Sequence, residues 1–313
     1  MRTVPSISVV IPAYNCAHTL KRAVQSVFDQ TYSDYEIIII DDGSTDDTLK
    51  IIGQFHDSRL RFVRHKKSLG AAAARNAGIK AAEGNIIAFL DADDEWLPNK
   101  LLYQVSQLNK KQQSGACFCG FYLRSERFCN EMYGRVIIPT NHKNWYKHLM
   151  MGCGLGPGTN MIVRRKWFDE IGFFDESLKR YEDWDWVLRL SNLAMLEVIK
   201  LPLAKINRGS PPPASIIEEA SQIFLQKRAS EFLKYGAYGR KAIAKRWLEV
   251  ALHFYYEKKF RKGNFYLRKG LMYYPFQKLG YYLMILDAVL GTSISIHISN
   301  IFEKYIRHKN GKL

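Results

Sequence analysis

The chain has 313 residues, of which 47% are hydrophobic and 13% aromatic, so it can bury a substantial core and is not a chain disordered throughout. Its net charge of +16 is concentrated at one end, because residues 205–313 carry 20 Lys/Arg against 7 Asp/Glu, a net charge of +13. Nucleic acid, an anionic membrane face and an anionic substrate would all be attracted by such a region, and charge alone does not choose among them.

The cysteines and the N-terminus indicate the cellular compartment. The five cysteines are odd in number and include no Cys-x-x-Cys pair of the zinc or redox kind. Residues 1–5 lead directly into a strand-like run, without a cleavage signal behind an apolar stretch. We therefore expect reduced thiols and a cytoplasmic location.

The first ninety residues alternate between strand-like and helix-like patterns. β-Branched and apolar runs mark strands, and apolar residues at helical spacing follow them. The strands are expected at 7–11, 36–40, 60–63 and 86–90, and the helices near 20–28, 45–55 and 71–82. This order predicts an α/β fold of the Rossmann-like kind, with a mostly parallel sheet covered by helices on both faces. Ligands of such sheets bind beyond the carboxyl ends of the strands, so the residues directly after each strand are the candidates for function.

The pattern becomes mixed beyond residue 98. We expect a helix near 98–112, strands near 115–123, 134–138 and 159–164, and a helix that begins at Asp183. A proline-rich loop then precedes a basic helical stretch. These features predict an α/β domain over residues 1–208 and a basic helical C-terminal region over residues 209–313.

The C-terminal region contains one pattern that resembles a degenerate tetratricopeptide hairpin. Its positions are Trp247, Val250, Ala251, Phe254, Gly263, Leu267, Gly270 and Pro275. A single hairpin of this kind cannot bury its apolar face alone, so it should pack on another element. Residues 279–302 are the most apolar stretch but contain Asp287 and several Ser and Thr, which predicts a buried or interfacial helix and not a membrane span.

Two acidic clusters follow predicted strands. Asp91, Asp93 and Asp94 come directly after the apolar run that ends at Leu90. Carboxylates crowded in this way repel one another, and a divalent cation that also binds phosphate relieves the repulsion. The alternative is that Asp94 only caps the helix that follows Pro98.

Asp41 and Asp42 form the second cluster and precede Gly43 at the end of a strand of isoleucines. Carboxylates accept hydrogen bonds from the N–H groups of a base or the hydroxyls of a ribose, and a glycine lets the backbone pass close to a ligand. The alternative is helix capping by Ser44, Thr45 or Asp46.

These blocks together resemble the family 2 glycosyltransferases of GT-A fold. The similar segments, in the family's order, are Val9 to Asn15, Asp41 to Asp46, Gly70 to Gly78, Asp91 to Asp94, Ile171 to Glu176 and Glu182 to Leu190. The resemblance covers roughly residues 5–215. It implies an inverting, metal-dependent enzyme that uses a nucleotide sugar, with a UDP-sugar as the expected donor.

The resemblance also implies roles for single residues. It places the donor pocket at Pro12, Tyr14, Asp41, Asp42, Arg75, Asp91 and Arg208. Tyr14 would lie against the nucleobase, Asp42 would accept from the base edge, and Arg75 would lie near the base and phosphates. Asp93 would ligate Mg²⁺ or Mn²⁺ that bridges the diphosphate. Arg208 would reach the donor phosphates when a loop closes, but three successive prolines depart from the family pattern there.

The same resemblance gives Asp183 the role of the base that deprotonates the acceptor hydroxyl. The alternative is that Asp183 caps its helix. Glu182 is expected to position it, and Asp185 to cap or to pair with Arg189. Trp184 and Trp186 face different ways on a helix, so at most one can stack on an acceptor sugar, and core packing is the commoner fate of such residues.

Three expectations concern partners. The acceptor is expected to be a surface glycan or its lipid-linked precursor, as in polysaccharide and lipopolysaccharide synthesis, and transfer of one sugar is favoured because no Gln-x-x-Arg-Trp block follows Asp183. The basic region predicts peripheral attachment to an anionic inner leaflet, through Lys241, Lys245, Arg246, Lys258, Lys259, Arg261 and Lys262. The alternative function is nucleic-acid binding by the same region and its aromatics Trp247, Phe254, Tyr255, Tyr256, Phe265 and Tyr266.

Overall fold

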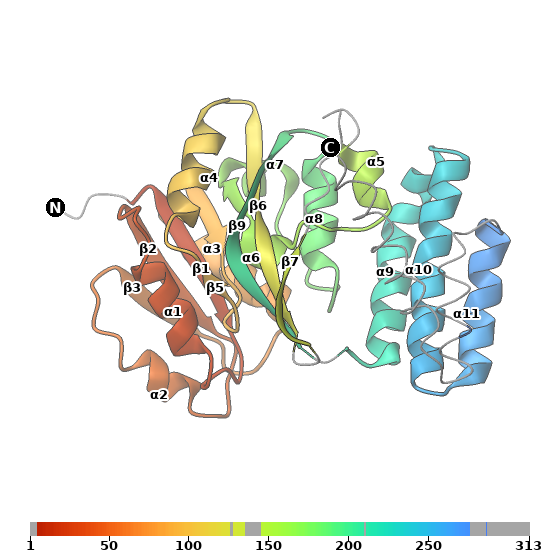
Figure 1. Cartoon of the computed structure of the whole chain (residues 1–313), viewed down its shortest axis with the longest axis horizontal. Helices are drawn as coiled ribbons and strands as arrows, with labels where there is room; N and C mark the ends of the chain where they lie inside the picture. The colour runs from red at the N-terminus through yellow and green to blue at the C-terminus, as the bar shows by residue number, and fades with distance from the viewer. Residues whose placement is uncertain (1–4, 126–127, 135–144, 210, 276–285, 287–313) are drawn as a thin grey trace, which may run out of the picture. The chain divides into compact units, whose positions relative to one another are not determined.

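A computed structural model describes residues 5–125, 128–134, 145–209, 211–275 and 286, without the side chains of 124–134 and 208. The chain divides into two compact units, residues 1–210 and residues 211–313. The first unit is an α/β structure and the second is helical in its described part (Figure 1).

The first half of the sheet is parallel, as the strand and helix pattern predicts. Its strands are β1 (Ile7–Ala13), β2 (Tyr35–Asp41), β3 (Leu60–Arg64) and β4 (Ile86–Phe89), in the spatial order β3-β2-β1-β4. The connecting helices are α1 (Leu20–Phe28), α2 (Thr48–Ile52) and α3 (Ala71–Ala81). β1 and β2 are buried on both faces, which explains their continuous runs of β-branched residues.

The second half of the sheet is mixed. Its strands are β5 (Glu95–Trp96), β6 (Ser114–Ser125), β7 (Phe128–Gly134), β8 (Ile162–Arg164) and β9 (Met195–Arg208), which continue the sheet as β4-β8-β6-β9-β5 with β7 on β6. The helices are α4 (Lys100–Asn109), α5 (Trp145–Met150), α6 (Pro157–Asn160), α7 (Lys166–Ile171) and α8 (Glu182–Leu190). β8 is antiparallel to both neighbours, whereas β6 and β9 are parallel to each other.

The sequence pattern gave no strand at 195–208, yet β9 is the longest strand described. Its segment mixes Lys, Glu and Pro with apolar residues, so it shows no clean two-residue alternation. Register-shifted parallel pairing with β6 along almost its whole length is what makes it a strand. The strand expected at 159–164 is shorter, because residues 157–160 form α6. Most of the strand expected at 134–138 lies outside the described residues, as does nearly all of the segment 279–302.

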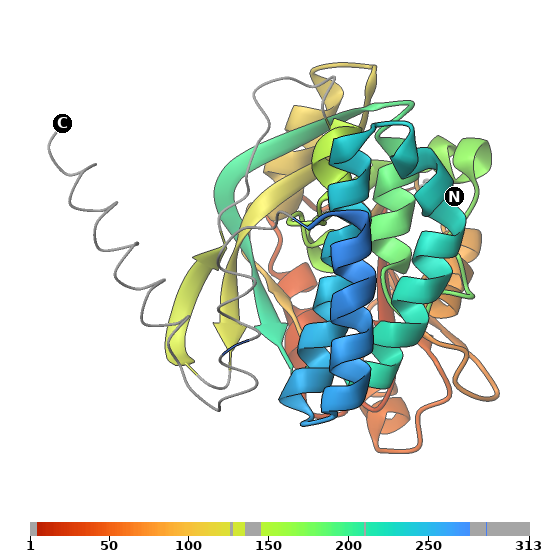
Figure 2. The ribbon, with the colours of Figure 1, turned by 90° about the vertical axis from the view of Figure 1, so that its right-hand side faces the viewer.

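Three helices form the described part of the second unit: α9 (Ala214–Leu233), α10 (Ala237–Tyr256) and α11 (Phe260–Tyr273), which run side by side (Figure 2). Trp247 and Phe254 from α10 both stack on Tyr266 from α11, with ring centroids 5.6 and 5.8 Å away. Gly263 and Gly270 let α11 approach closely, since a Cβ at Gly263 would lie 2.7 Å from the ring of Tyr255. No helix in the described residues is both long enough and apolar enough to cross a bilayer.

Candidate active site

The carboxyl ends of β1, β2 and β4 lie side by side, because these strands are parallel neighbours. The segments that follow them therefore share one edge of the sheet. Asn15, at φ 48°, ties two of these loops together: its Oδ1 accepts from the Thr45 N–H at 2.8 Å, and its own N–H donates to Ser44 Oγ at 3.0 Å. The ring of Tyr14 remains 52% exposed beside them and is available to stack on a planar group. Pro12 lies within β1, opposite Ile40.

Asp41 shapes the turn after β2. It is fully buried, and its Oδ1 accepts from the N–H of Ser44 at 3.0 Å. Its Oδ2 lies 3.1 Å from Nε of Arg64 as an ion pair but has no hydrogen-bond partner among the described residues. Gly43 has φ +73° and no room for a Cβ, which would lie 2.6 Å from the backbone of Lys67. The N–H of Thr48, the first residue of α2, donates to Asp46 at 2.9 Å, so the Asp41 and Asp42 pair is not needed to satisfy the start of this helix.

Asp42 holds the loop that leads into α3. Its carboxylate accepts from His65 Nδ1 at 2.6 Å, from Ser68 Oγ at 2.7 Å, and from the N–H groups of Leu69 and Gly70 at 3.0 and 2.9 Å. Burial raises the pKa of this carboxyl, but these donors outweigh burial and keep the pKa below its usual value. Both oxygens are thus engaged by the protein, and recognition of a base edge by Asp42 stays a prediction.

Arg75 connects the two sides of the site. The buried guanidinium donates from Nη2 to Asp91 Oδ1 at 2.7 Å and from Nη1 to Glu182 Oε1 at 2.6 Å. Burial lowers the pKa of Arg75, but Asp91, Glu182 and Asp183 raise it by more, so the side chain is permanently charged. Gly158 in α6 lies against this pair, and a Cβ there would be 2.5 Å from Asp91 Oδ2. The structure therefore gives Arg75 two carboxylate partners, and contact with a donor base or phosphate stays a prediction.

Asp183 lies in the first turn of α8, one residue beyond Glu182. The helix is preceded by Tyr181 at φ 71°, a left-handed conformation that is uncommon for a non-glycine residue and sets the direction in which α8 begins. Asp183 Oδ1 accepts from the Trp184 N–H at 2.6 Å, but the residue is inside the helix and not at its cap. Burial and the neighbouring Glu182 raise the pKa of Asp183 to about 7, against a smaller lowering by Arg75. A carboxyl with this pKa can exchange a proton near neutral pH.

Asp93 and Asp94 differ in their surroundings. Asp94 is buried; its carboxylate accepts from the hydroxyl of Thr159 and, at 2.7 Å, from the N–H of Asn207. It does not cap the next helix, because α4 begins only at Lys100. Burial and the carboxylates of Asp91 and Asp93 raise the pKa of Asp94 to about 8. Asp93 is exposed, and partial desolvation together with Asp91 raises its pKa.

This distribution fits a divalent cation held by few protein ligands. Asp91 and Asp94 already have protein partners, which leaves Asp93 as the carboxylate of the cluster that is exposed and unpaired in the described residues. Mg²⁺ commonly binds through one or two carboxylates and takes its other ligands from water and substrate phosphates. No group of three or more His, Cys, Asp or Glu side chains in the described residues forms a metal centre by itself.

Other predicted residues have structural partners. Trp184 and Trp186 are both buried, and their indole N–H groups donate to the carbonyls of Leu149 and Gly172, so both pack in the core. Asp185 pairs with Arg189 at 3.0 Å, as the i,i+4 spacing suggests. The backbone of Arg208 ends β9, but its side chain lies outside what the structure describes, so its donor contact stays a prediction.

Sequence reasoning missed several residues that shape the site, namely His65, Gly158, Thr159 and Asn207. Each contacts a conspicuous aspartate from a distant part of the chain; Thr159 and Asp94, for example, are 65 residues apart. No short-range pattern marks such pairs. Gly158 ends a glycine-rich run that is visible in the sequence, but the sequence does not indicate which residues this run contacts.

Comparisons with known proteins agree with this geometry. The family described as Glycosyl transferase family 2 matches residues 8–172, just over half of the chain. The chain is 33% identical over 190 residues to the Escherichia coli UDP-Glc:alpha-D-GlcNAc-diphosphoundecaprenol beta-1,3-glucosyltransferase WfgD, across 61% of this chain and 72% of that protein. An uncharacterized glycosyltransferase of Rickettsia bellii is 30% identical over 238 residues, which are 72% of this chain but 34% of that protein.

Solved structures show the same fold. TarS 1-349 of S. aureus, in complex with UDP-GlcNAc, matches with a TM-score of 0.63 and 18% identity over 90% of this chain and 81% of that chain. The mannosyltransferase PcManGT of Pyrobaculum calidifontis, in complex with GDP-Man and Mn²⁺, matches with a TM-score of 0.55 and 17% identity over 96% of this chain and 88% of that chain. The predicted fold class, a GT-A-like α/β sheet followed by C-terminal helices, is confirmed. The family expected from the ordered motifs is confirmed too, and the chain belongs to the family 2 glycosyltransferases.

Proposed function

We propose that this glycosyltransferase moves one sugar from a UDP-sugar to a hydroxyl group of a lipid-linked glycan precursor, with inversion at the sugar C1. Support for the donor comes from the sheet edge that carries Tyr14, Asp41 and Asp42, and from the UDP-GlcNAc complex of TarS. Support for the acceptor comes from WfgD, whose name specifies a diphosphoundecaprenol-linked sugar. The chain is 33% identical to WfgD and spans 72% of its length. We therefore propose the same class of acceptor for this enzyme.

The observation that carries this proposal is the raised pKa of Asp183 beside the ion pairs of Arg75. Asp183 takes the proton of the acceptor hydroxyl while the acceptor oxygen bonds to C1 and the bond from C1 to the diphosphate oxygen breaks. The electron pair of that bond leaves with the nucleoside diphosphate. A single displacement of this kind on an α-linked sugar diphosphate gives a β-linked product, the linkage in the name of WfgD.

A divalent cation is part of the proposal. Asp93 would hold it, with Asp91 close by and anchored on Arg75. When bound, Mg²⁺ or Mn²⁺ neutralises charge on the departing diphosphate. The Mn²⁺ in the PcManGT complex supports the choice of metal at the level of shared fold.

Nucleic-acid binding is less well supported by the same region. Of the six aromatics expected to stack on bases, Trp247, Phe254, Tyr255 and Tyr266 are buried between the helices of the second unit. Tyr256 and Phe265 remain exposed. Single-strand binding of this type relies on successive accessible aromatic faces, which two separated rings do not supply.

One experiment tests the catalytic proposal. Asp183→Asn should bind UDP with Mn²⁺ nearly as wild type does, measured by calorimetry, yet lose transfer of sugar to a lipid-linked acceptor by at least about 10³-fold, within the range of general-base contributions. Asp169→Asn, which removes an exposed carboxylate on α7, is the matched control and should retain activity. Wild-type turnover by Asp183→Asn would remove this residue from the role of base.

A further inference from the structure

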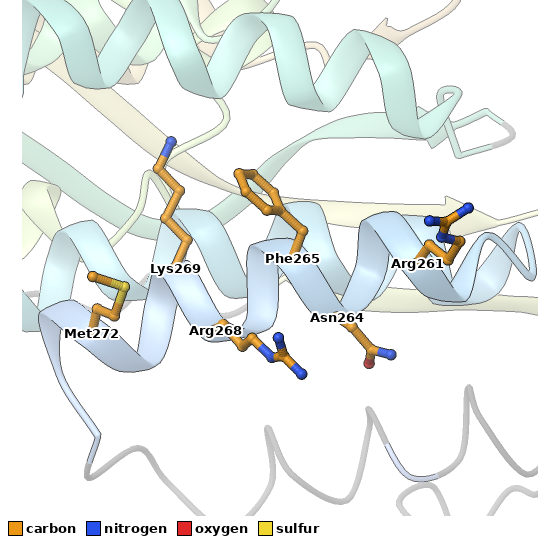
Figure 3. Close-up of a pocket in the computed structure, with 6 residues that line it drawn as sticks. All are labelled: Arg261, Asn264, Phe265, Arg268, Lys269 and Met272. Atoms are coloured by element: carbon orange, nitrogen blue, oxygen red, sulfur yellow. The ribbon is translucent and has the colours of Figure 1, made fainter.

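The outer face of α11 carries cations and large apolar groups together. Arg261, Asn264, Phe265, Arg268, Lys269 and Met272 follow one another at spacings of three, one, three, one and three residues, which places them along one side of the helix. They line an open groove of about 650 Å³ (Figure 3). The opposite side of α11, with Gly263, Tyr266 and Gly270, is buried.

The two arginines are available to bind anions. Neither Arg261 nor Arg268 makes an ion pair with another described residue. They are seven positions apart in the helix, a distance of about 10 Å along the axis, and Phe265 lies between them. The sequence of α11 contains no Asp or Glu, so no acidic side chain of the helix opposes them.

The apolar members of the groove are exposed to an unusual degree. Phe265 is 60% exposed and Met272 is 85% exposed. One exposed apolar side chain is ordinary. Here an aromatic and a methionine lie within two turns of unpaired arginines, so this surface can bind apolar groups and anionic groups at the same time.

Most cations that the sequence offered for membrane attachment have other partners. Arg246 is buried and pairs with Glu249, Lys259 pairs with Glu257, and Lys262 pairs with Glu218. Lys241 lies over the ring of Tyr274. Of that set, Arg261 lies on the α11 groove, where it and Arg268 are both exposed and have no ion pair with a described residue.

We propose that the α11 groove docks on an anionic bilayer, with Arg261 and Arg268 at lipid phosphates and Phe265 and Met272 inserted among the acyl chains just below the headgroups. Charge complementarity and the apolar side chains favour this occupant over a nucleic acid, which would leave Met272 without a hydrophobic partner. The choice of a bilayer rests in part on the proposed lipid-linked acceptor. Docking would hold the enzyme at the surface in which that acceptor is embedded.

Sedimentation with vesicles tests this without any sugar transfer. The full-length protein should bind vesicles of 30% phosphatidylglycerol in phosphatidylcholine at low salt, and bind pure phosphatidylcholine vesicles far more weakly. Arg261→Gln with Arg268→Gln should lower the partition coefficient roughly 30-fold, about fivefold for each charge. Phe265→Ala should lower it roughly tenfold, as expected for loss of one inserted aromatic.

Matched controls come from the same unit. Arg240 and Lys234 are exposed and off the groove. Arg240→Gln with Lys234→Gln changes the net charge equally but should lower the partition coefficient less than threefold. Leu233, 44% exposed at the end of α9, is the apolar control as Leu233→Ala.

No binding by the wild-type protein, or equal losses in groove and control variants, would overturn the proposal. Tighter binding to an oligonucleotide than to anionic vesicles, with the same dependence on Arg261 and Arg268, would replace it with nucleic-acid binding. Because vesicle binding needs no turnover, its failure leaves the catalytic proposal standing.

Discussion

Arg75 on α3 donates to Glu182 on α8 at 2.6 Å, across 107 residues of sequence. The other arm of the same guanidinium holds Asp91, just beyond β4, at 2.7 Å. One side chain therefore sets the distance between the strand end that carries the acidic cluster and the helix that carries Asp183.

Removing this bridge should cost both stability and turnover. Arg75→Gln leaves two carboxylates without their cation, and breaking a buried pair in this way costs about 3–5 kcal/mol of unfolding free energy. Arg75→Lys keeps the charge but lacks the planar fork, so we expect a folded protein with kcat reduced about 100-fold by misplacement of Asp183. Denaturant titration and steady-state kinetics measure the two effects.

The control for Arg75 is Arg59, which pairs with Asp57 at 2.8 Å on the surface. Arg59→Lys should change the unfolding free energy by less than about 1 kcal/mol and leave kcat unchanged. If Arg75→Lys chiefly raised KM for the donor with kcat intact, Arg75 would be a donor-binding residue and not a bridge.

Transfer should depend on the ionisation of Asp183. Only the carboxylate form can accept a proton, and its pKa is raised to about 7, so kcat/KM should rise tenfold per pH unit below pH 7 and level off above it. A pH profile under conditions that saturate the metal measures this. A profile that is flat from pH 5 to pH 8 would be inconsistent with this assignment.

The same ionisation affects stability with the opposite trend. The carboxyl of Asp183 ionises near 3.8 in the unfolded chain and near 7 in the folded one, so the unfolded state releases its proton first and stability falls as pH rises between these values. Asp183→Asn removes this contribution, so the melting temperature of the variant should rise relative to that of the wild type between pH 5 and pH 8. A constant difference across this range would contradict the raised pKa.

Asp93 and Asp94 should separate into a ligand and a structural residue. Asp94→Ala removes the acceptor of the Asn207 N–H and of the Thr159 hydroxyl. The unfolding free energy should fall by about 1–3 kcal/mol for each buried donor left unpaired. Asp93→Asn changes an exposed side chain, so its unfolding free energy should stay within about 0.5 kcal/mol of wild type.

Calorimetry of UDP binding with and without Mn²⁺ completes that comparison. Asp93→Asn should abolish the gain in UDP affinity that Mn²⁺ confers on the wild type. A metal effect of wild-type size in this variant would mean that Asp93 is not the metal ligand.

Gly158 should tolerate no side chain. A Cβ there would lie 2.5 Å from Asp91 Oδ2 and 3.1 Å from Arg75 Nη2, so Gly158→Ala must displace this ion pair. We expect a folded variant with transfer reduced at least about tenfold, measured by initial rates. Gly154→Ala is the matched control, because nothing lies within 4 Å of a Cβ at Gly154. Equal activity of the two variants would show that the ion pair can shift without cost.

The sequence by itself determined the order of the elements over residues 7–90 and the edge at which the site lies. Runs such as Ile37 to Ile40 can be buried on both faces only in a covered sheet, and parallel strands bring their carboxyl ends together, so Tyr14, Asp41 and Asp91 could be placed near one another from pattern alone. Only the tertiary structure decided what each side chain touches. Asp42 is saturated by the 65–70 loop, Asp94 holds Thr159 and Asn207, and β9 is a strand because β6 lies beside it. The physical reason is range: strand and helix periodicity is a local property of the chain, whereas a hydrogen bond or a sheet pairing between residues far apart in sequence depends on how the whole domain packs.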